Sequence, residues 1–384
     1  MSQVSELTED FLPSDSTTPL LSVEGLSVTF PTDDGDVRAV RNVSFELNPG
    51  DVLGIVGESG SGKSVSSMAI MGLLPGSARI DGSIKYRGNE LVGRSYKQMQ
   101  PFRSKHISMI FQDPMTSLNP VYTVGWQLAE AYRAHHDVSK KAAWAKAVEA
   151  LELVGIPQPD KRAAQFPHEF SGGMRQRVVI AMAIINDPSV IIADEPTTAL
   201  DVTVQAQILD TMLRIQQETD AAIVMITHDL GVVAGMVNRV QVMYGGTVVE
   251  SGPVDEVFET PRMPYTVGLL GSVPNPSTLG KRLTPIKGAP PSLVNLPSGC
   301  SFTPRCPLAA DVCHESEPVL GEAGLPNHLT RCHRWEHLAS LQNPQKLFIT
   351  DEIGVVENPA SLVVANPDEV SVVADVVRVE GDLS

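Results

Sequence analysis

A glycine-rich loop at residues 57–64 has the residue types and spacing of a phosphate-binding site. It reads Gly-Glu-Ser-Gly-Ser-Gly-Lys-Ser and matches the pattern G-x-x-x-x-G-K-[ST]. Glycines let the backbone approach phosphate oxygens, and backbone N–H groups at a helix N-terminus attract an anion. We expect Lys63 to contact the β- and γ-phosphates and Ser64 to ligate Mg²⁺. The rest of the expected ATP-binding loop is Gly57, Ser59, Gly60 and Gly62. The alternative is a glycine-rich turn that binds nothing.

Three polar side chains follow apolar runs further along the chain. Asp194 and Glu195 follow the run Val190–Ala193, and His228 follows Ala222–Thr227. A carboxylate at the C-terminal end of a parallel strand points into the ligand crevice of the sheet. We therefore expect Asp194 to bind Mg²⁺, Glu195 to orient or deprotonate an attacking water, and His228 to donate to the γ-phosphate. The alternatives are a surface acid pair and a solvated histidine.

A second anion site is predicted at the turn Phe170-Ser-Gly-Gly-Met174, which opens an apolar helix. Ser171 and the N–H groups of Gly172 and Gly173 would face the anion. The alternative is a helix start capped by Ser171. Two such anion sites in a chain with one phosphate loop raise the question of where the second one points.

The elements around these turns indicate an α/β fold. Leu21–Phe30 and Ala39–Leu47 alternate as half-buried strands do. Val52–Val56 and the runs before Asp194 and His228 are continuously apolar, as in parallel strands covered by helices on both faces. Residues 125–156 have the 3–4 spacing of buried helix faces, shown by Trp144, Ala147, Val148, Leu151 and Val154.

Charge and hydropathy exclude several classes of protein. The 384 residues carry a net charge of −16, and the acids concentrate in residues 1–20 and 346–384, which we expect to be disordered tails. The short run Leu362–Ala365 offers a strand as the alternative. No basic stripe favours a nucleic acid, and no apolar run is long enough for a transmembrane helix. The start lacks the pattern of a secretion signal, so an intracellular protein is expected.

Four cysteines lie within one stretch of 33 residues that begins in a proline-rich segment: Cys300, Cys306, Cys313 and Cys332. In a chain without an export signal, such clustering favours a metal site over disulfides. Four thiolates can hold tetrahedral Zn²⁺ or a [4Fe–4S] cluster, and four reduced structural thiols are the alternative.

In order and spacing, these motifs resemble those of an ABC-type ATPase. The set comprises the loop 57–64, Gln112, the signature 170–174, Asp194-Glu195, Asp201 and His228. The segments 283–292 and 297–307 resemble those of the D-type ATPase subunit of dipeptide and oligopeptide importers. The resemblance implies an ABC-type ATP-binding core at 21–252, with a parallel sheet flanked by helices, an N-terminal antiparallel β subdomain and a helical signature subdomain at about 113–170. An irregular cysteine-containing extension follows at 253–345.

The resemblance also implies roles for single residues. Phe30 would stack on adenine, with a core strand position as the alternative; Gln112 would sense the γ-phosphate and Mg²⁺; Asp201 would communicate across a dimer. Ser171, Gly172 and Gly173 would act in trans on the nucleotide of a second ATPase subunit, itself or a paralogue. In related subunits the extension carries iron and sulfur, which favours [4Fe–4S] over Zn²⁺.

The function implied is ATP-powered import of di- or oligopeptides from the cytoplasmic face of the membrane, as a peripheral subunit. Its partners would be two transmembrane permease subunits and, indirectly, an extracytoplasmic peptide-binding protein. An importer of nickel or another small solute is the first alternative. A soluble ATPase without a transport role, as in DNA repair, is the second, but only 106 residues separate Ser64 from Ser171, too few for a long coiled-coil insertion. A nucleotide-gated regulatory module is the third, and Glu195 with His228 argues against it.

Overall fold

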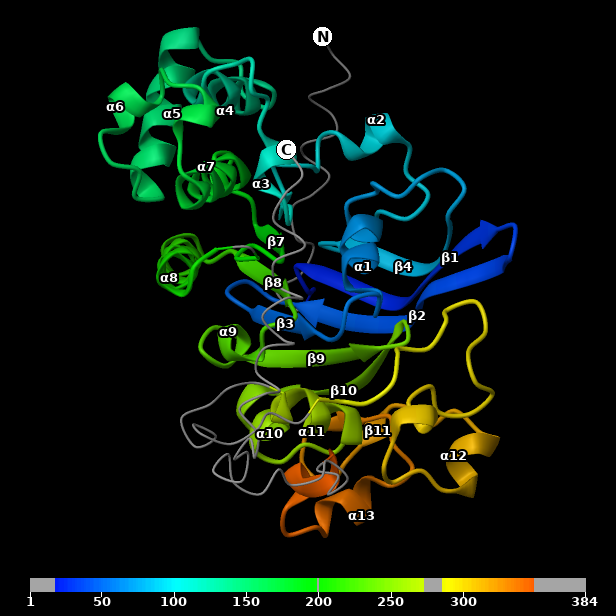
Figure 1. Cartoon of the computed structure of the whole chain (residues 1–384). Helices are drawn as coiled ribbons and strands as arrows, with labels where there is room; N and C mark the ends of the chain where they lie inside the picture. The colour runs from blue at the N-terminus through cyan, green and yellow to red at the C-terminus, as the bar shows by residue number, and fades with distance from the viewer. Residues whose placement is uncertain (1–17, 199, 273–284, 349–384) are drawn as a thin grey trace, which may run out of the picture. The chain divides into compact units, whose positions relative to one another are not determined.

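The computed structural model describes residues 18–198, 200–272 and 285–348 (Figure 1). The predicted disorder of residues 1–20 and 346–384 falls mostly outside the described residues, as does the alternative strand at Leu362–Ala365. Of the described parts of these tails, Leu20 is buried and residues 346–348 belong to a short 3₁₀ helix, Pro344–Phe348.

A four-stranded antiparallel sheet forms the N-terminal part of the described chain. Its strand order is β2-β1-β4-β5. The strands are β1 (Leu21–Thr32), β2 (Gly35–Leu47), β4 (Arg79–Tyr86) and β5 (Asn89–Glu90). The predicted alternation is clear at the end of β2, where Val43, Phe45 and Leu47 are buried and Ser44 and Glu46 are exposed. In β1 it is interrupted, because Ser22 is buried between Leu21 and Val23.

The second sheet contains the strands that carry the predicted chemistry. Its order is β11-β12-β10-β9-β3-β8-β7-β6, and the five strands from β9 to β6 are parallel. The strands are β3 (Val52–Val56), β6 (Ile107–Ile110), β7 (Val190–Asp194), β8 (Ala222–Thr227), β9 (Arg239–Tyr244), β10 (Thr247–Pro253), β11 (Gly321–Glu322) and β12 (Leu329–Thr330). Every residue of β3, β7 and β8 is buried, as continuous apolar runs predict.

The register brings the functional ends of these strands together. Val56 pairs with Thr227, and Asp194 pairs with Ile226. The carboxyl ends of β3, β7 and β8 therefore lie at one edge of the sheet, where the crevice of a parallel sheet forms.

Thirteen α-helices occur in the described part of the chain (Figure 1). They are α1 (Lys63–Ile70), α2 (Tyr96–Met99), α3 (Pro114–Ser117), α4 (Val124–Arg133), α5 (Lys140–Leu153), α6 (Pro159–Arg162), α7 (Gly172–Ile184), α8 (Val202–Thr219), α9 (Leu230–Ala234), α10 (Val254–Glu259), α11 (Pro264–Gly271), α12 (Asp311–Glu315) and α13 (Trp335–Ala339). Short 3₁₀ helices span Pro167–Glu169 (η1), Thr303–Arg305 (η3) and Pro344–Phe348 (η4). None of the helices in this part of the chain is both long and apolar enough to cross a membrane.

Helices α4 to α7 pack on one another and present the signature turn. The predicted apolar face of α5 is confirmed, because Ala147, Leu151 and Val154 are fully buried and Trp144 and Val148 pack against the same cluster. Helix α7 begins at the signature turn, and Val178 and Ala181 bury it in the same core.

The segment after β10 is joined to the core by backbone pairing and shared side chains. Strand β12 pairs with β10, with Thr330 opposite Glu250. Phe302 is 1% exposed and packs at right angles to Tyr244 of β9, 5.2 Å between ring centroids. Pro253 precedes and Pro261 follows the six-residue helix α10, and Pro264 is the first residue of the eight-residue helix α11. The extension therefore adds to the main core.

Candidate active site

Two glycines of the phosphate loop sit where no side chain fits. A Cβ on Gly57 would lie 2.2 Å from the carbonyl oxygen of Met243, and one on Gly62 would lie 2.4 Å from that of Ala39. Gly62, at φ +102°, immediately precedes helix α1. At Gly60, φ is +78° and the space around a Cβ is open. The loop is thus pressed between β2 and β9, with its middle facing outward.

Lys63 is folded back over its own loop. Its Nζ donates to the carbonyl oxygens of Gly57 at 2.8 Å and Glu58 at 3.0 Å. Burial lowers the pKa of Lys63, while Glu195, Asp194 and Glu58 oppose this shift by attraction. A buried ammonium held only by carbonyls can exchange those partners for the stronger acceptors of a phosphate.

Ser64 and Asp194 bring two oxygen atoms together at the start of α1. The Ser64 hydroxyl donates to Oδ1 of Asp194 at 3.0 Å. Asp194 is 5% exposed, and burial raises the pKa of its carboxyl group. Hydroxyl and carboxylate oxygens are the ligands that Mg²⁺ prefers.

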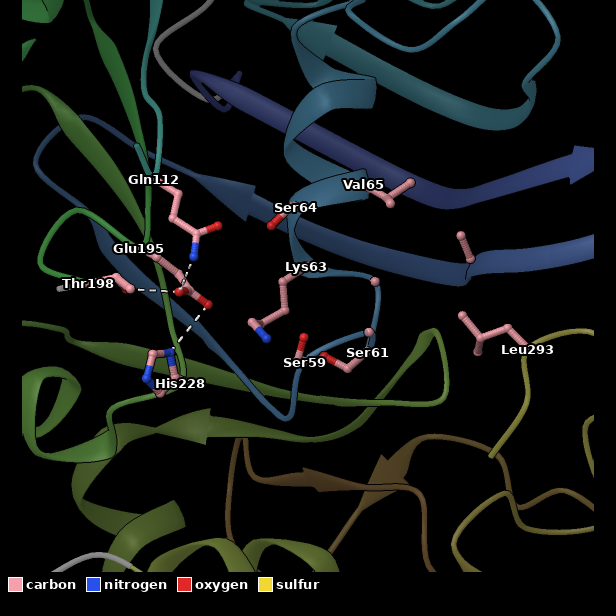
Figure 2. A pocket seen from close by; sticks show the side chains of 13 residues that line it. Ser59, Ser61, Lys63, Ser64, Val65, Gln112, Glu195, Thr198, His228 and Leu293 are labelled. Atoms are coloured by element: carbon pink, nitrogen blue, oxygen red, sulfur yellow. Dashed lines mark hydrogen bonds and ion pairs between the residues drawn. The ribbon is translucent and has the colours of Figure 1, made fainter. Parts of the chain in front are cut away.

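Glu195 is held by side chains from three different segments (Figure 2). Its Oε2 accepts from Gln112 Nε2 at 3.0 Å and from Thr198 Oγ1 at 2.9 Å. Its Oε1 lies 3.3 Å from Nδ1 of His228. The backbone of Glu195 is left-handed, at φ +49°, and its N–H donates to the carbonyl of Ile226 at 2.8 Å. This backbone conformation costs free energy for any residue other than glycine. It therefore persists only because the surrounding contacts stabilise it.

Most of these residues line a cavity of about 600 Å³; the predicted site residues Gly57 and Asp194 do not belong to its lining. Figure 2 shows Lys63, Ser64, Gln112, Glu195 and His228 around it. Its other lining residues include Ala39, Ser59, Gly60, Ser61, Gly62, Val65, Thr198 and Leu293. The sequence analysis did not predict Thr198 and Leu293 as site residues, nor Ala39, Ser61 and Val65. A hydroxyl three residues after Glu195 is a local signal for Thr198, whereas Leu293 comes from the extension and no local pattern marks it.

Other predicted site residues lie outside the cavity lining. Ser171 caps helix α7, accepting from the N–H of Met174 at 3.4 Å, and Ser171 and Gly172 are exposed. Asp201 is exposed and caps α8 by accepting from the N–H of Val204 at 3.0 Å. Phe30 is half-buried in β1 opposite Val37. Within one chain, therefore, the signature turn and the phosphate loop do not line the same cavity.

The four cysteines form no disulfide bond, and all of them lie in the extension. The N–H of Cys300 donates to the carbonyl of Cys313 at 2.8 Å. Burial raises the pKa of Cys306 and of Cys332 to about 12, and the neighbouring cysteines add to the rise. Among the described residues, however, no three Cys, His, Asp or Glu side chains are arranged so that they could hold a metal ion. The predicted metal centre thus has no support in this arrangement of side chains.

Two family profiles match the chain. The ABC transporter profile matches residues 40–198, and the profile described as the oligopeptide/dipeptide transporter C-terminal region matches residues 249–313. The first match spans the phosphate loop and Glu195, and the second covers three of the four cysteines.

Curated relatives and solved structures agree with these profiles. The oligopeptide transport ATP-binding protein OppD of Mycobacterium tuberculosis is 56% identical over 83% of this chain, and the chain spans about half of that relative, 52%. The dipeptide transport ATP-binding protein DppD of Bacillus subtilis is 55% identical over 78% of this chain and 90% of the relative. A structure of cbiO1 from Clostridium perfringens, titled as part of an ABC transporter complex, aligns with a TM-score of 0.55 at 27% identity, covering 66% of this chain and 95% of that one. A dimeric ATP-binding cassette, MJ0796 bound to ADP and Pi, aligns with a TM-score of 0.56 over 61% of this chain and 98% of that chain; at 24% identity it speaks to the fold alone. The α/β fold expected from the sequence is confirmed, and the chain belongs to the ABC transporter family, in the branch of oligopeptide and dipeptide transport ATP-binding proteins.

Proposed function

We propose that this chain is the ATP-hydrolysing subunit of an importer of dipeptides or oligopeptides. The observation that carries the proposal is the grouping of Lys63, Ser64, Asp194, Glu195 and His228 at the carboxyl edge of the parallel sheet. The peptide cargo is inferred from the relatives, whose names describe oligopeptide and dipeptide transport.

The proposed reaction is attack of water on the γ-phosphorus of ATP. Glu195 orients the water and accepts its proton, so that a P–O bond forms as the bond to the β-phosphate oxygen breaks and ADP leaves. Lys63 and His228 stabilise the negative charge that develops on the γ-phosphate. Gln112 donates to Glu195 in the structure, and it is well placed to report whether the γ-phosphate is present.

The oxygen pair of Ser64 and Asp194 fits Mg²⁺ by its chemistry, with Gln112 as a third oxygen donor in the same cavity lining. When bound, the ion would neutralise charge on the β- and γ-phosphate oxygens. Ser64 would turn its hydroxyl from Asp194 toward the ion, keeping a partner in both states.

A second ATPase subunit completes the proposed site. Ser171, Gly172 and Gly173 lie at the start of helix α7, outside the cavity of their own chain, and Ser171 and Gly172 are exposed, which supports their use by a partner's nucleotide. Asp201, exposed at the start of α8, is proposed to lie at the same interface. The interface is two-fold if the partner is a second copy and pseudo-two-fold if it is a paralogue. Phe30 is proposed to contact adenine.

The proposed partners that couple ATP hydrolysis to transport are two transmembrane permease subunits. The chain would bind them as a peripheral subunit on the cytoplasmic face of the membrane. A groove of about 750 Å³ separates α2 from α4 and α7, and its lining includes Tyr96, Lys97, Arg103, Lys105 and His135. At the start of α4, the rings of Trp126 and of the preceding Tyr122 stack with their centroids 4.1 Å apart, and each residue is more than 40% exposed. Basic and aromatic groups of this kind suit an amphipathic cytoplasmic helix of a partner. A peptide-binding protein outside the membrane would act through the permease.

The cysteines remain a proposed [4Fe–4S] site, with Zn²⁺ as the alternative. Four cysteines in one small, partly buried segment support it, but the thiols would have to rearrange to share a metal. Iron, sulfide and zinc measured on protein purified without oxygen test the proposal, because absence of all three leaves four structural thiols.

Peptide uptake and ATP turnover in one membrane system test the proposed function. The chain is expressed with its permease partners in vesicles, and release of phosphate is measured alongside uptake of labelled tripeptide and of ⁶³Ni²⁺. We expect peptide uptake and ATP turnover to be lost together in Lys63→Ala. Uptake of nickel but not peptide would overturn the cargo, and undiminished turnover in the variant would overturn the site.

A further inference from the structure

The extension reaches the phosphate loop through Arg305, the last residue of η3. Its two terminal nitrogens lie 2.6 and 2.9 Å from the two carboxylate oxygens of Glu58, the second residue of the loop. The side chain of Arg305 is 5% exposed, and that of Glu58 is 25% exposed. A bidentate ion pair of this kind fixes the relative orientation of the two side chains and also balances their charges.

Glu58 is held at its backbone as well as at its side chain. Its N–H donates to the hydroxyl of Tyr265 at 2.8 Å, and its carbonyl accepts from Lys63 at 3.0 Å. Tyr265 is fully buried in α11, so this anchor also belongs to the extension. The first turn of the loop is thus tied to the extension at two points and to the catalytic lysine at a third.

Arg305 is also held in place by contacts with residues other than Glu58. Its Nε donates to the carbonyl of Lys287 at 3.2 Å, and one terminal nitrogen lies 3.3 Å from the hydroxyl of Tyr244. The guanidinium also lies 5.8 Å from the centre of the Tyr244 ring. Because these contacts fix the orientation of the Arg305 guanidinium group, the side chain loses little further conformational freedom when it binds Glu58.

The charge of Glu58 gives this contact a consequence for ligand binding. The carboxylate belongs to the loop that would carry a triphosphate, and it interacts electrostatically with Lys63. Left unpaired, it would repel the phosphates at short range in a partly buried site, where charges are weakly screened.

We propose that Arg305 is a positioning residue for ATP binding, which holds the phosphate loop through Glu58 and neutralises that carboxylate. The inference rests on the proposed function, since it takes ATP as the ligand of this loop. It assigns to the extension a direct part in nucleotide affinity, beyond any role of the cysteines.

The first test replaces Arg305 by Met in the full chain and measures MgATP affinity with a fluorescent nucleotide, together with KM and kcat. We expect affinity to fall about tenfold or more, with KM rising in step and kcat within about twofold, because Arg305 does not touch the reacting atoms. Arg305→Lys should recover part of the loss, since it keeps the charge but cannot form both bonds. A KM within about twofold of wild type in Arg305→Met would overturn the proposal.

The double variant Glu58→Gln with Arg305→Met separates charge repulsion from a general loss of structure. It removes both partners, so no unpaired carboxylate remains although the loop is still not held, and we expect an affinity between that of Arg305→Met and that of wild type. If the double variant binds as weakly as Arg305→Met alone, neutralisation of Glu58 is not the role of Arg305.

Glu317→Gln is the matched control. It breaks a similar two-pronged pair with Arg41, at 3.0 and 2.9 Å, which also joins the extension to the core but involves no residue of the phosphate loop. Its MgATP affinity should equal that of wild type, and an equal loss would mean that any loosening of the extension suffices. If wild type itself binds no MgATP, the proposed function fails; if wild type binds and Arg305→Met binds equally, only this inference fails.

Discussion

Glu195 combines a strained backbone with a carboxylate that has two side-chain donors and a histidine beside it. Because an ionised carboxylate only accepts hydrogen bonds, Gln112 and Thr198 can both donate to the same oxygen, Oε2. The other oxygen, Oε1, faces His228, whose side chain is 60% exposed. One face of the carboxylate is thus fixed by the protein and the other borders the cavity, as a group that must orient a water requires.

Glu195→Gln is expected to separate ATP binding from hydrolysis. The amide keeps the size of the side chain but cannot accept a proton, so turnover should fall about 100-fold or more while MgATP still binds. Phosphate release and nucleotide binding measured on the same preparation check this. Thr198→Val is the companion variant, since it removes one bond to Glu195 and leaves the base, and its loss should be smaller. Turnover within tenfold of wild type in Glu195→Gln would place the base elsewhere.

The thiols give a prediction about pH. Since burial raises the pKa of Cys306 and Cys332 to about 12, their thiolate fraction at pH 8 is about a thousandfold below that of an exposed cysteine. In protein shown to be free of iron and zinc, both should react very slowly with iodoacetamide at pH 8, and the rates should rise about tenfold per pH unit up to pH 10. Mass spectrometry after timed alkylation gives the rates, with urea-unfolded protein as the fast reference. Rapid modification of both residues in folded protein would contradict their burial.

At the scale of elements, local sequence patterns predicted the strands and turns. They did not predict contacts between residues that are far apart in the sequence. Strands β3, β7 and β8 follow from unbroken apolar runs, and the helix starts follow from Lys63 and Ser171 in their motifs. No local signal announces that Leu293 lines the cavity or that Arg305 meets Glu58, 247 residues earlier in the chain.

The same limit applies to β4 and to the extension. Arg79–Tyr86 lacks a clean alternation because Asp81 and Gly82 interrupt it at an irregularity in its pairing with β1. The extension has many prolines and few long apolar runs, which hid the two-residue strand β12 that adds it to the main sheet. Sequence periodicity needs several residues, so elements this short leave no pattern.

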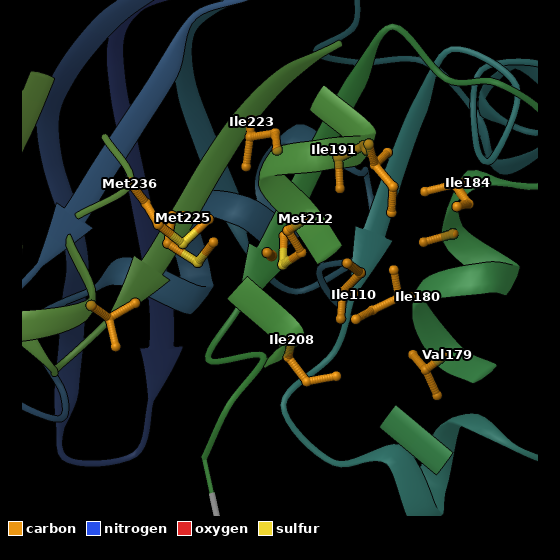
Figure 3. Close-up of a cluster of buried hydrophobic side chains, with 14 of the residues drawn as sticks. Ile110, Val179, Ile180, Ile184, Ile191, Ile208, Met212, Ile223, Met225 and Met236 are labelled. Carbon is orange, nitrogen blue, oxygen red and sulfur yellow. The ribbon is translucent and has the colours of Figure 1, made fainter. Parts of the chain in front are cut away.

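Helix α8 offers a matched pair of substitutions, one of them in the cluster of buried hydrophobic side chains that Figure 3 shows. Ile208 is fully buried near Met212, whereas Val202, one and a half turns earlier on the same helix, is 81% exposed. Ile208→Ala should lower the free energy of unfolding by about 2–5 kcal/mol, because it leaves a cavity. Val202→Ala should change it by less than about 0.5 kcal/mol. Urea unfolding followed by circular dichroism measures both, and similar effects of the two would contradict the packing of α8.

At the scale of the whole molecule, the proposed function requires the phosphate loop of one chain and the signature turn of another to bind one nucleotide. In a single chain only the phosphate loop lines the cavity, while the signature turn is exposed at the start of α7. If each signature turn binds the nucleotide of its neighbour, as proposed, two chains are needed, and each supplies what the other lacks. This arrangement makes ATP affinity and self-association depend on each other.

Gly172 allows the two-chain arrangement to be tested without disturbing the fold. A Cβ at Gly172 would meet its nearest neighbour, Leu200, only at 4.0 Å, whereas one at Gly173 would lie 2.5 Å from Val204. Gly172→Glu therefore fits within its own chain, and it would place a negative charge where a partner's γ-phosphate is proposed to lie. In the Glu195→Gln background we expect MgATP to drive dimer formation, and adding Gly172→Glu should abolish the dimer while leaving MgATP affinity of the monomer within about twofold. Sedimentation velocity with and without MgATP reads out the dimer. A paralogous partner would appear as no dimer in either variant until that subunit is added, whereas an ATP-driven dimer that survives Gly172→Glu would show that the signature turn does not face the nucleotide of its neighbour.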